Sequence, residues 1–112
     1  LVVVADELDA GQQPQAVYHW HGHPDAAWWF EAGWALVALG AAQLWVACSR
    51  PEISGADLQR LAGSRGQLSL VSTIDGASPV VWWVFALAAN RPALEVDVSG
   101  RQIRVLGQSF SV

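Results

Sequence analysis

The three histidines of the chain stand at alternating positions, His19, His21 and His23, and they are the side chains best suited to metal or acid–base chemistry. In a β-strand, successive side chains point to opposite faces, so these imidazoles would share one face while Tyr18 and Trp20 would share the other. In a helix the histidines would spread around the cylinder, and the glycine and proline among them would interrupt it. We therefore expect a strand with one polar face and one face in the core.

Metal binding is one role that this segment could have. Neutral imidazoles followed by Asp25 could supply ligands to zinc, with His21 as the candidate ligand. However, same-face neighbours on an extended strand lie about 6.5 to 7 Å apart, too far for three histidines to share one tetrahedral ion unless Gly22 bends the chain. A structural role of half-exposed histidines stays open as well.

Composition excludes several classes of partner and enzyme. A chain of 112 residues with 53% hydrophobic content fits one small domain over residues 1–112. The net charge of −4, with six arginines and no lysine, gives no basic surface for nucleic acid or an anionic membrane, so neither partner is expected. Cys48 is the single cysteine, so it cannot form an internal disulfide, and its apolar surroundings indicate an inert buried thiol. The sequence contains neither a G-x-S-x-G nucleophile elbow nor a phosphate-binding glycine loop.

The ends of the chain and its longest apolar stretch bear on membrane targeting. Residues 26–48 contain Glu31 and Gln43 and are divided by two glycines, which favours buried strands over a spanning helix. The first residues, Leu-Val-Val-Val, lack the features of a signal peptide. Because an apolar strand opens the chain directly, we expect the chain to be the C-terminal part of a longer protein.

Short apolar, β-branched runs separated by turn residues predict an all-β fold. The expected strands are residues 1–8, 15–21, 28–39, 42–48, 67–74, 80–88, 94–98 and 101–105, with polar turns at residues 10–14 and 75–76. Residues 49–66 break the apolar pattern and are expected to form a loop, in which Ser54 could cap one helical turn. Eight or nine short strands at this spacing indicate an antiparallel β-sandwich.

The register of the central hairpin can be predicted from its turn. A tight turn at residues 40–41 places Ala35 opposite Val46 and Val37 opposite Leu44. Both faces of this hairpin are apolar, so we expect it to be covered on both sides.

The C-terminal hairpin has the clearest local pattern. A two-residue turn at residues 99–100 places Val96 opposite Ile103 on one face and Glu95 opposite Arg104 on the other. We therefore expect one face in the core and one in solvent, with Gly100 at positive φ.

Two adjacent tryptophan pairs, Trp28–Trp29 and Trp82–Trp83, lie within expected strands. Neighbours in a strand point to opposite faces, so one member of each pair is exposed unless another layer covers it. An exposed indole could stack on a sugar ring or lie between two copies of the chain.

The order of these segments resembles the C-terminal β-sandwich of heparinase II/III-like polysaccharide lyases. The segments that carry the resemblance are LVVVADEL, AVYHWHGHPD, the glycine-divided WALVALGAAQLWVACSRPE, WWVFALAANRP and the terminal VDVSGRQIRV. In that family, a strand ending near an acidic residue is followed by a strand ending in an aromatic-histidine pattern and a proline. The likeness covers most of the chain.

The resemblance implies a parent enzyme, periplasmic or secreted, that cleaves acidic polysaccharides such as heparan sulfate or alginate by β-elimination. The family's tyrosine and asparagine come from an N-terminal helical toroid, and a key histidine comes from an upstream strand, so no catalytic residue is assigned to this chain. The resemblance implies that His19 and His21 stand where the sandwich face approaches the cleft or a structural metal found in some members. The candidate contacts with the polysaccharide are therefore His19 and His21, together with Trp28. The implied module requires no cofactor itself, although the parent enzyme could hold zinc.

Three functions are therefore compared. The first is a catalytically incomplete lyase module whose partner is acidic polysaccharide, bound through the parent enzyme. The second is a stand-alone carbohydrate-binding sandwich, and the third is a protein-interaction module such as an immunity or assembly factor. In each case the exposed aromatic surface predicts self-association or docking to an N-terminal domain.

Overall fold

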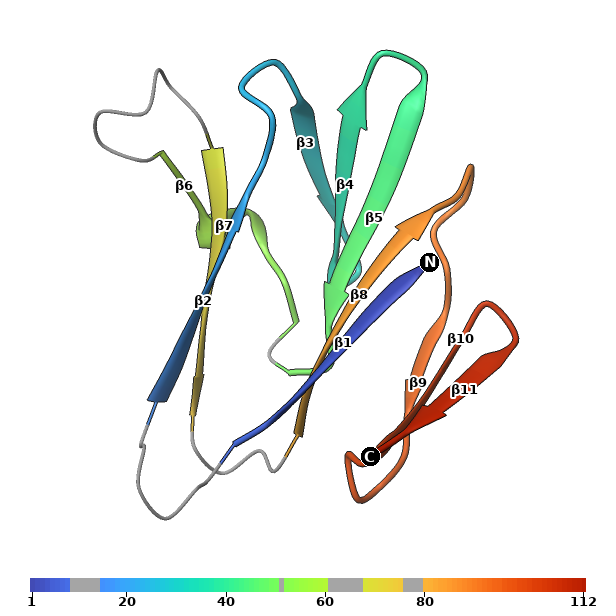
Figure 1. Ribbon diagram of the computed structural model, residues 1–112. Helices are drawn as coiled ribbons and strands as arrows, with labels where there is room; N and C mark the ends of the chain where they lie inside the picture. Colours follow the sequence, from blue (N-terminus) through green and yellow to red (C-terminus); the bar gives the residue numbers. More distant parts are fainter. Residues whose placement is uncertain (9–14, 51, 61–67, 76–79) are drawn as a thin grey trace.

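The computed structural model describes residues 1–8, 15–50, 52–60, 68–75 and 80–112. Within them, eleven short strands form three antiparallel sheets stacked as three layers (Figure 1). The predicted all-β, antiparallel fold is confirmed, although the described strands exceed the expected eight or nine and a third sheet extends the sandwich. The helical content of the described residues is one 3₁₀ turn, η1 (Gly55–Asp57).

The five-stranded middle sheet has the order β1-β8-β5-β4-β3. Its strands are β1 (Val2–Glu7), β3 (Ala27–Glu31), β4 (Trp34–Leu39), β5 (Ala42–Cys48) and β8 (Val80–Leu87). The stretch tested above for a membrane span thus forms the meander β3-β4-β5. Among the described residues, no helix has the length and apolar character needed to cross a bilayer.

Two three-stranded sheets cover the middle sheet, one on each face (Figure 1). The first consists of β2 (Gln15–His21), β6 (Leu58–Arg60) and β7 (Leu68–Asp75), in the order β2-β7-β6. The second consists of β9 (Leu94–Val96), β10 (Gln102–Val105) and β11 (Gln108–Ser111), in the order β11-β10-β9.

Strand β8 explains why one segment can be apolar at every position. Trp82 packs in the core between the middle and C-terminal sheets, and Trp83 packs in the core on the β2-β7-β6 side. They are 2% and 0% exposed. Both tryptophans of this pair are buried because each face of the middle sheet has its own covering layer.

Hydrogen bonds between polar tips also join the layers. The Tyr18 hydroxyl donates to the Asp6 carboxylate at 2.6 Å, which links β2 to β1. The Trp82 indole N–H donates to the carbonyl of Gly100 at 2.8 Å, which links the middle sheet to the C-terminal hairpin. Buried Tyr and Trp side chains generally need such partners.

The predicted register of the β4-β5 hairpin is confirmed, with Ala35 opposite Val46 and Val37 opposite Leu44. The prediction of a single extended segment over residues 28–39 is wrong. Glu31 pairs with Trp34, so the chain reverses between β3 and β4 at Ala32 and Gly33. Both turn residues have positive φ, 46° for Ala32 and 80° for Gly33. The turn could not be predicted from the sequence, because alanine, like most L-residues, rarely adopts positive φ.

The predicted pairs of the C-terminal hairpin, Val96 with Ile103 and Glu95 with Arg104, are confirmed. The prediction of a two-residue turn at residues 99–100 is wrong, because the loop between β9 and β10 spans residues 97–101. Within this loop the Gly100 N–H donates to the Asp97 carbonyl at 3.0 Å. The Asp97 carboxylate accepts a hydrogen bond from the Gln102 N–H at 2.9 Å, so this side chain ends the hydrogen-bond ladder between β9 and β10. Gly100 has the expected positive φ, 73°.

Two strands were not predicted. Strand β6 lies in the expected loop 49–66 and follows η1, where the Ser54 N–H donates to the Asp57 carboxylate at 2.7 Å. Strand β11 follows a turn at Leu106 and Gly107, both at positive φ. The turn predicted at residues 10–14 lies outside the described residues. Of the turn predicted at residues 75–76, Asp75 is the last residue of β7 and Gly76 lies outside the described residues.

Candidate functional site

The outer face of β2 carries the histidines selected from the sequence. Val17, His19 and His21 are exposed, whereas Tyr18 and Trp20 are half-buried and pack towards the middle sheet. The predicted separation into a polar face and a core face is therefore confirmed for β2. We call Val17, His19 and His21 the histidine face.

The inner side of β2 is held by contacts between aromatic rings. The Trp20 ring lies edge-on to Trp83 and Phe85, with centroid distances of 5.4 and 4.8 Å, and the Tyr18 ring lies 5.5 Å from Trp83. Edge-to-face pairs at these distances stabilise a core beyond the area that they bury. This packing prevents β2 from rotating and so holds His19 and His21 towards solvent.

His21 has a defined ring orientation. Its Nδ1 lies 2.8 Å from the hydroxyl oxygen of Ser69, a buried residue directly opposite on β7. A hydrogen bond at Nδ1 orients an imidazole ring and leaves Nε2 for a second partner. The structure therefore gives His21 a fixed ring with one nitrogen available for a ligand.

His23 does not continue the row, because β2 ends at His21 and the chain bends at Gly22. The His23 Nδ1 accepts the backbone N–H of Asp25 at 3.1 Å and so belongs to the turn. In the part of the chain that the structure describes, no group of three or more His, Cys, Asp or Glu residues is placed to hold a metal ion. A zinc role for His21 stays a prediction.

The bend at Gly22 also positions Trp28. A Cβ atom on Gly22 would lie 2.5 Å from Cζ2 of Trp28, so only glycine lets the chain pass so close to this indole. Trp28 is half-buried against the core on the β2-β7-β6 side, whereas Trp29 is 54% exposed on the edge strand β3. The outward member of this pair is thus Trp29, and the side chain of Trp28 supports the end of the histidine face.

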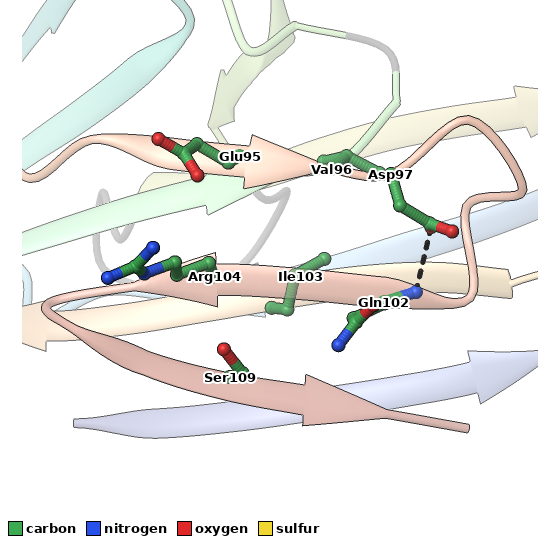
Figure 2. A pocket seen from close by; sticks show the side chains of 7 residues that line it. All are labelled: Glu95, Val96, Asp97, Gln102, Ile103, Arg104 and Ser109. Atoms are coloured by element: carbon green, nitrogen blue, oxygen red, sulfur yellow. Dashed lines mark hydrogen bonds between the residues drawn. The ribbon is translucent and has the colours of Figure 1, made fainter.

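A second polar surface lies on the outer face of the C-terminal sheet (Figure 2). This surface contains a hollow of about 310 Å³ that is open to solvent. The lining residues are Glu95, Val96, Asp97, Gln102, Ile103, Arg104 and Ser109. The alternation of residues 94–105 predicted a solvent face here, but the contribution of β11 could not be foreseen because that strand was missed.

Titration differs between the surface and the core. Hydrogen bonds from the Ser99 hydroxyl and the Gln102 N–H hold the pKa of Asp97 below its ordinary value. Burial, together with the bond to Asp6, raises the pKa of Tyr18 far above its ordinary value. These groups keep one protonation state around neutral pH, Asp97 as an anion and Tyr18 as a neutral donor.

Comparisons with protein-family models, curated proteins and solved structures found no match to this chain. The function is therefore argued from its own residues.

Proposed function

We propose that this chain is a β-sandwich module of a heparinase II/III-like polysaccharide lyase and that the histidine face contacts the acidic polysaccharide. In this proposal the module is catalytically incomplete alone. The groups that carry out β-elimination belong to the rest of the parent enzyme.

The order of the strands supports the lyase reading of the sequence. The five segments that carry the resemblance coincide with β1, β2, the β4-β5 hairpin, β8 and the β9-β10 hairpin. Each of them contributes to at least one of the two cores, so they are framework strands of one antiparallel structure. A framework of this kind can position a surface beside a cleft.

One observation carries the role of the histidine face: His19 and His21 stand side by side in solvent, and the ring of His21 is oriented by Ser69. Neighbouring same-face residues lie about 7 Å apart, which allows the two imidazoles to contact separate groups of one extended polymer. When protonated, an imidazole donates from both nitrogens and attracts carboxylate or sulfate groups. A uronic-acid polymer supplies such anions along its length.

The reaction explains why polymer binding and proton transfer are assigned to different parts of the parent enzyme. β-Elimination requires a base to remove the C5 proton of a uronic acid, a group to neutralise its carboxylate, and an acid to protonate the departing glycosidic oxygen. His19 and His21 hold the chain of sugars through its carboxylates. This contact orients the polymer, and the proton transfers occur elsewhere.

Binding to defined oligosaccharides tests the contact. Alginate and heparan sulfate hexasaccharides should shift the NMR signals of β2, because the exposed imidazoles of His19 and His21 lie on this strand. The double variant His19→Gln/His21→Gln should weaken binding about tenfold or more through the loss of two imidazole contacts with the polymer. His23→Gln, whose ring belongs to the turn, is the matched control and should bind as the natural chain does.

Equal binding by the double variant and the natural chain would refute the role of the histidine face.

An eliminase assay tests the catalytic half of the proposal. The isolated 112-residue chain should release no unsaturated uronate from alginate or heparan sulfate, because it is proposed to lack the positioned base, neutralising group and acid. Product formation is followed by the ultraviolet absorbance of the new double bond. Turnover that disappears in His21→Ala would instead place the active site on β2.

A further inference from the structure

The outer face of the C-terminal sheet is built as a grid of polar side chains. Glu95 on β9, Arg104 on β10 and Ser109 on β11 are directly opposite one another across the three strands. The next row along contains Asp97 and Gln102. The inner residues of the same strands are apolar and bury themselves in the core, so the outward direction of the polar row is fixed by packing.

One carboxylate of this surface is already used by the fold. The two oxygens of Asp97 accept the Gln102 N–H at 2.9 Å and the Ser99 hydroxyl at 2.6 Å. Asp97 therefore forms a rigid, anionic end of the hollow. It holds the backbone at the start of β10 in place for a ligand.

The remaining charged groups are not used in this way. Among the described residues, the ion pairs are Glu31 with Arg91 and Glu7 with Arg101, at 3.4 and 2.7 Å. Glu95 and Arg104 form no ion pair there, although they face each other on adjacent strands. Figure 2 shows the charged groups of Glu95 and Arg104 at the same end of the hollow. The Gln102 amide and the Ser109 hydroxyl lie next to strand β10.

The chemistry of these groups selects a class of ligand. Arg104 offers only donors, Glu95 offers only acceptors, and Gln102 and Ser109 offer both. Two carboxylates against one guanidinium disfavour an anion, and the guanidinium disfavours a cation. A neutral molecule with many hydroxyl groups, each able to donate and accept, satisfies all of these side chains at once.

We propose that this hollow, lined by Glu95, Gln102, Arg104 and Ser109, binds an uncharged, hydroxyl-rich sugar residue of a polysaccharide. Its volume of about 310 Å³ lies at the small end of ligand sites, which suits a short saccharide unit. The surface lies on the outer layer opposite to the histidine face (Figure 1), so this site is independent of the contact with acidic polymer.

NMR titration of the natural chain with cellohexaose, laminarihexaose and mannohexaose tests the proposal. At least one of these neutral hexasaccharides, at concentrations up to about 10 mM, should shift the backbone signals of Glu95, Gln102 and Arg104. Glu95→Gln and Arg104→Gln should each weaken that binding about tenfold or more, as expected for the loss of one charge-assisted hydrogen bond. Both residues are exposed, so the variants should keep the spectrum of the folded chain.

Arg101→Gln is the matched control, because this arginine of the same hairpin pairs with Glu7 outside the hollow, and it should leave sugar binding unchanged. The double variant His19→Gln/His21→Gln should also bind the neutral sugar normally, which separates this site from the histidine face. Absence of shifts with all three sugars, binding unaffected by Arg104→Gln, or an alginate hexasaccharide that shifts the signals of Glu95, Gln102 and Arg104 at lower concentration than the neutral sugars would overturn the proposal.

Discussion

Cys48 shows how the core controls the chemistry of a single residue. The thiol is 5% exposed, and its Sγ lies 3.1 Å from the carbonyl oxygen of Arg50. Burial raises the pKa of Cys48 to about 11, because the thiolate would be poorly solvated there. The inert buried thiol expected from the sequence agrees with this placement.

The raised pKa predicts a loss of stability at alkaline pH. Between the ordinary cysteine value of 9.0 and about 11, the unfolded chain releases a proton that the folded chain keeps. The contribution of Cys48 to the free energy of unfolding should therefore be complete below pH 9. It should be lost as the pH rises to 11, which lowers the free energy of unfolding by roughly 3 kcal/mol at most. Urea unfolding at several pH values between 8 and 11 measures the slope.

Cys48→Ala provides the comparison for this slope. Tyr18 has a raised pKa too and acts in the same direction, so the contribution of Cys48 is the difference between the natural chain and the variant. Parallel pH profiles for the two proteins would show that Cys48 does not titrate as described.

At the scale of elements, the hairpin turns differ in how well their residues suit the backbone. The β3-β4 turn places Ala32 at φ 46° before Gly33 at φ 80°, and two consecutive positive φ values are typical of a type I′ turn. In the β4-β5 turn, Gly40 has positive φ and Ala41 does not. Ala32 is thus an L-residue in a conformation that asparagine and glycine adopt more easily.

We expect Ala32→Asn to stabilise the chain by about 0.5 to 1 kcal/mol, because it creates the Asn-Gly pair favoured in this turn. Ala41→Asn is the matched control, since the same substitution enters a two-residue turn at a position without positive φ. Thermal or urea unfolding compares the three proteins. A gain at Ala41 as large as that at Ala32 would mean that the effect does not arise from turn conformation.

At the scale of the whole molecule, the third layer changes which aromatic groups reach the surface. It covers Trp82, so the adjacent pair on β8 is entirely buried, and Trp29 is the tryptophan with the largest exposed fraction, 54%. Trp29 lies on β3, an edge strand of the middle sheet. Exposed backbone groups on an edge and a large exposed indole beside them favour pairing with another chain.

We predict that the isolated chain forms a dimer or larger assembly through the β3 edge. Trp29→Thr, which keeps a β-forming residue but removes the indole, should shift the assembly towards monomer. Val98→Thr is the control, because Val98 is fully exposed in the C-terminal hairpin loop and outside this edge. Sedimentation equilibrium at micromolar concentration gives the mass, and a monomeric natural chain would contradict the prediction.

The sequence by itself determined those features that depend on local periodicity and turn chemistry. The period of two placed His19 and His21 on one face of β2 and Tyr18 and Trp20 on the other. It also set the pairing of Val96 with Ile103. It also predicted that the β4-β5 hairpin is covered on both faces, because each face is apolar. These predictions succeeded since a one-residue shift would move every core side chain into solvent.

Only the tertiary structure decided how these elements combine. Short strands do not encode which sheet they join, so the third layer and the burial of Trp82 could not be derived from their patterns. The bond from His21 to Ser69 spans 48 residues, and the hollow beside Arg104 needs a strand that begins after Leu106, at an unfavourable φ of 48°. Contacts between distant segments and strained turns are imposed by packing of the whole chain, and local sequence preferences carry no record of them.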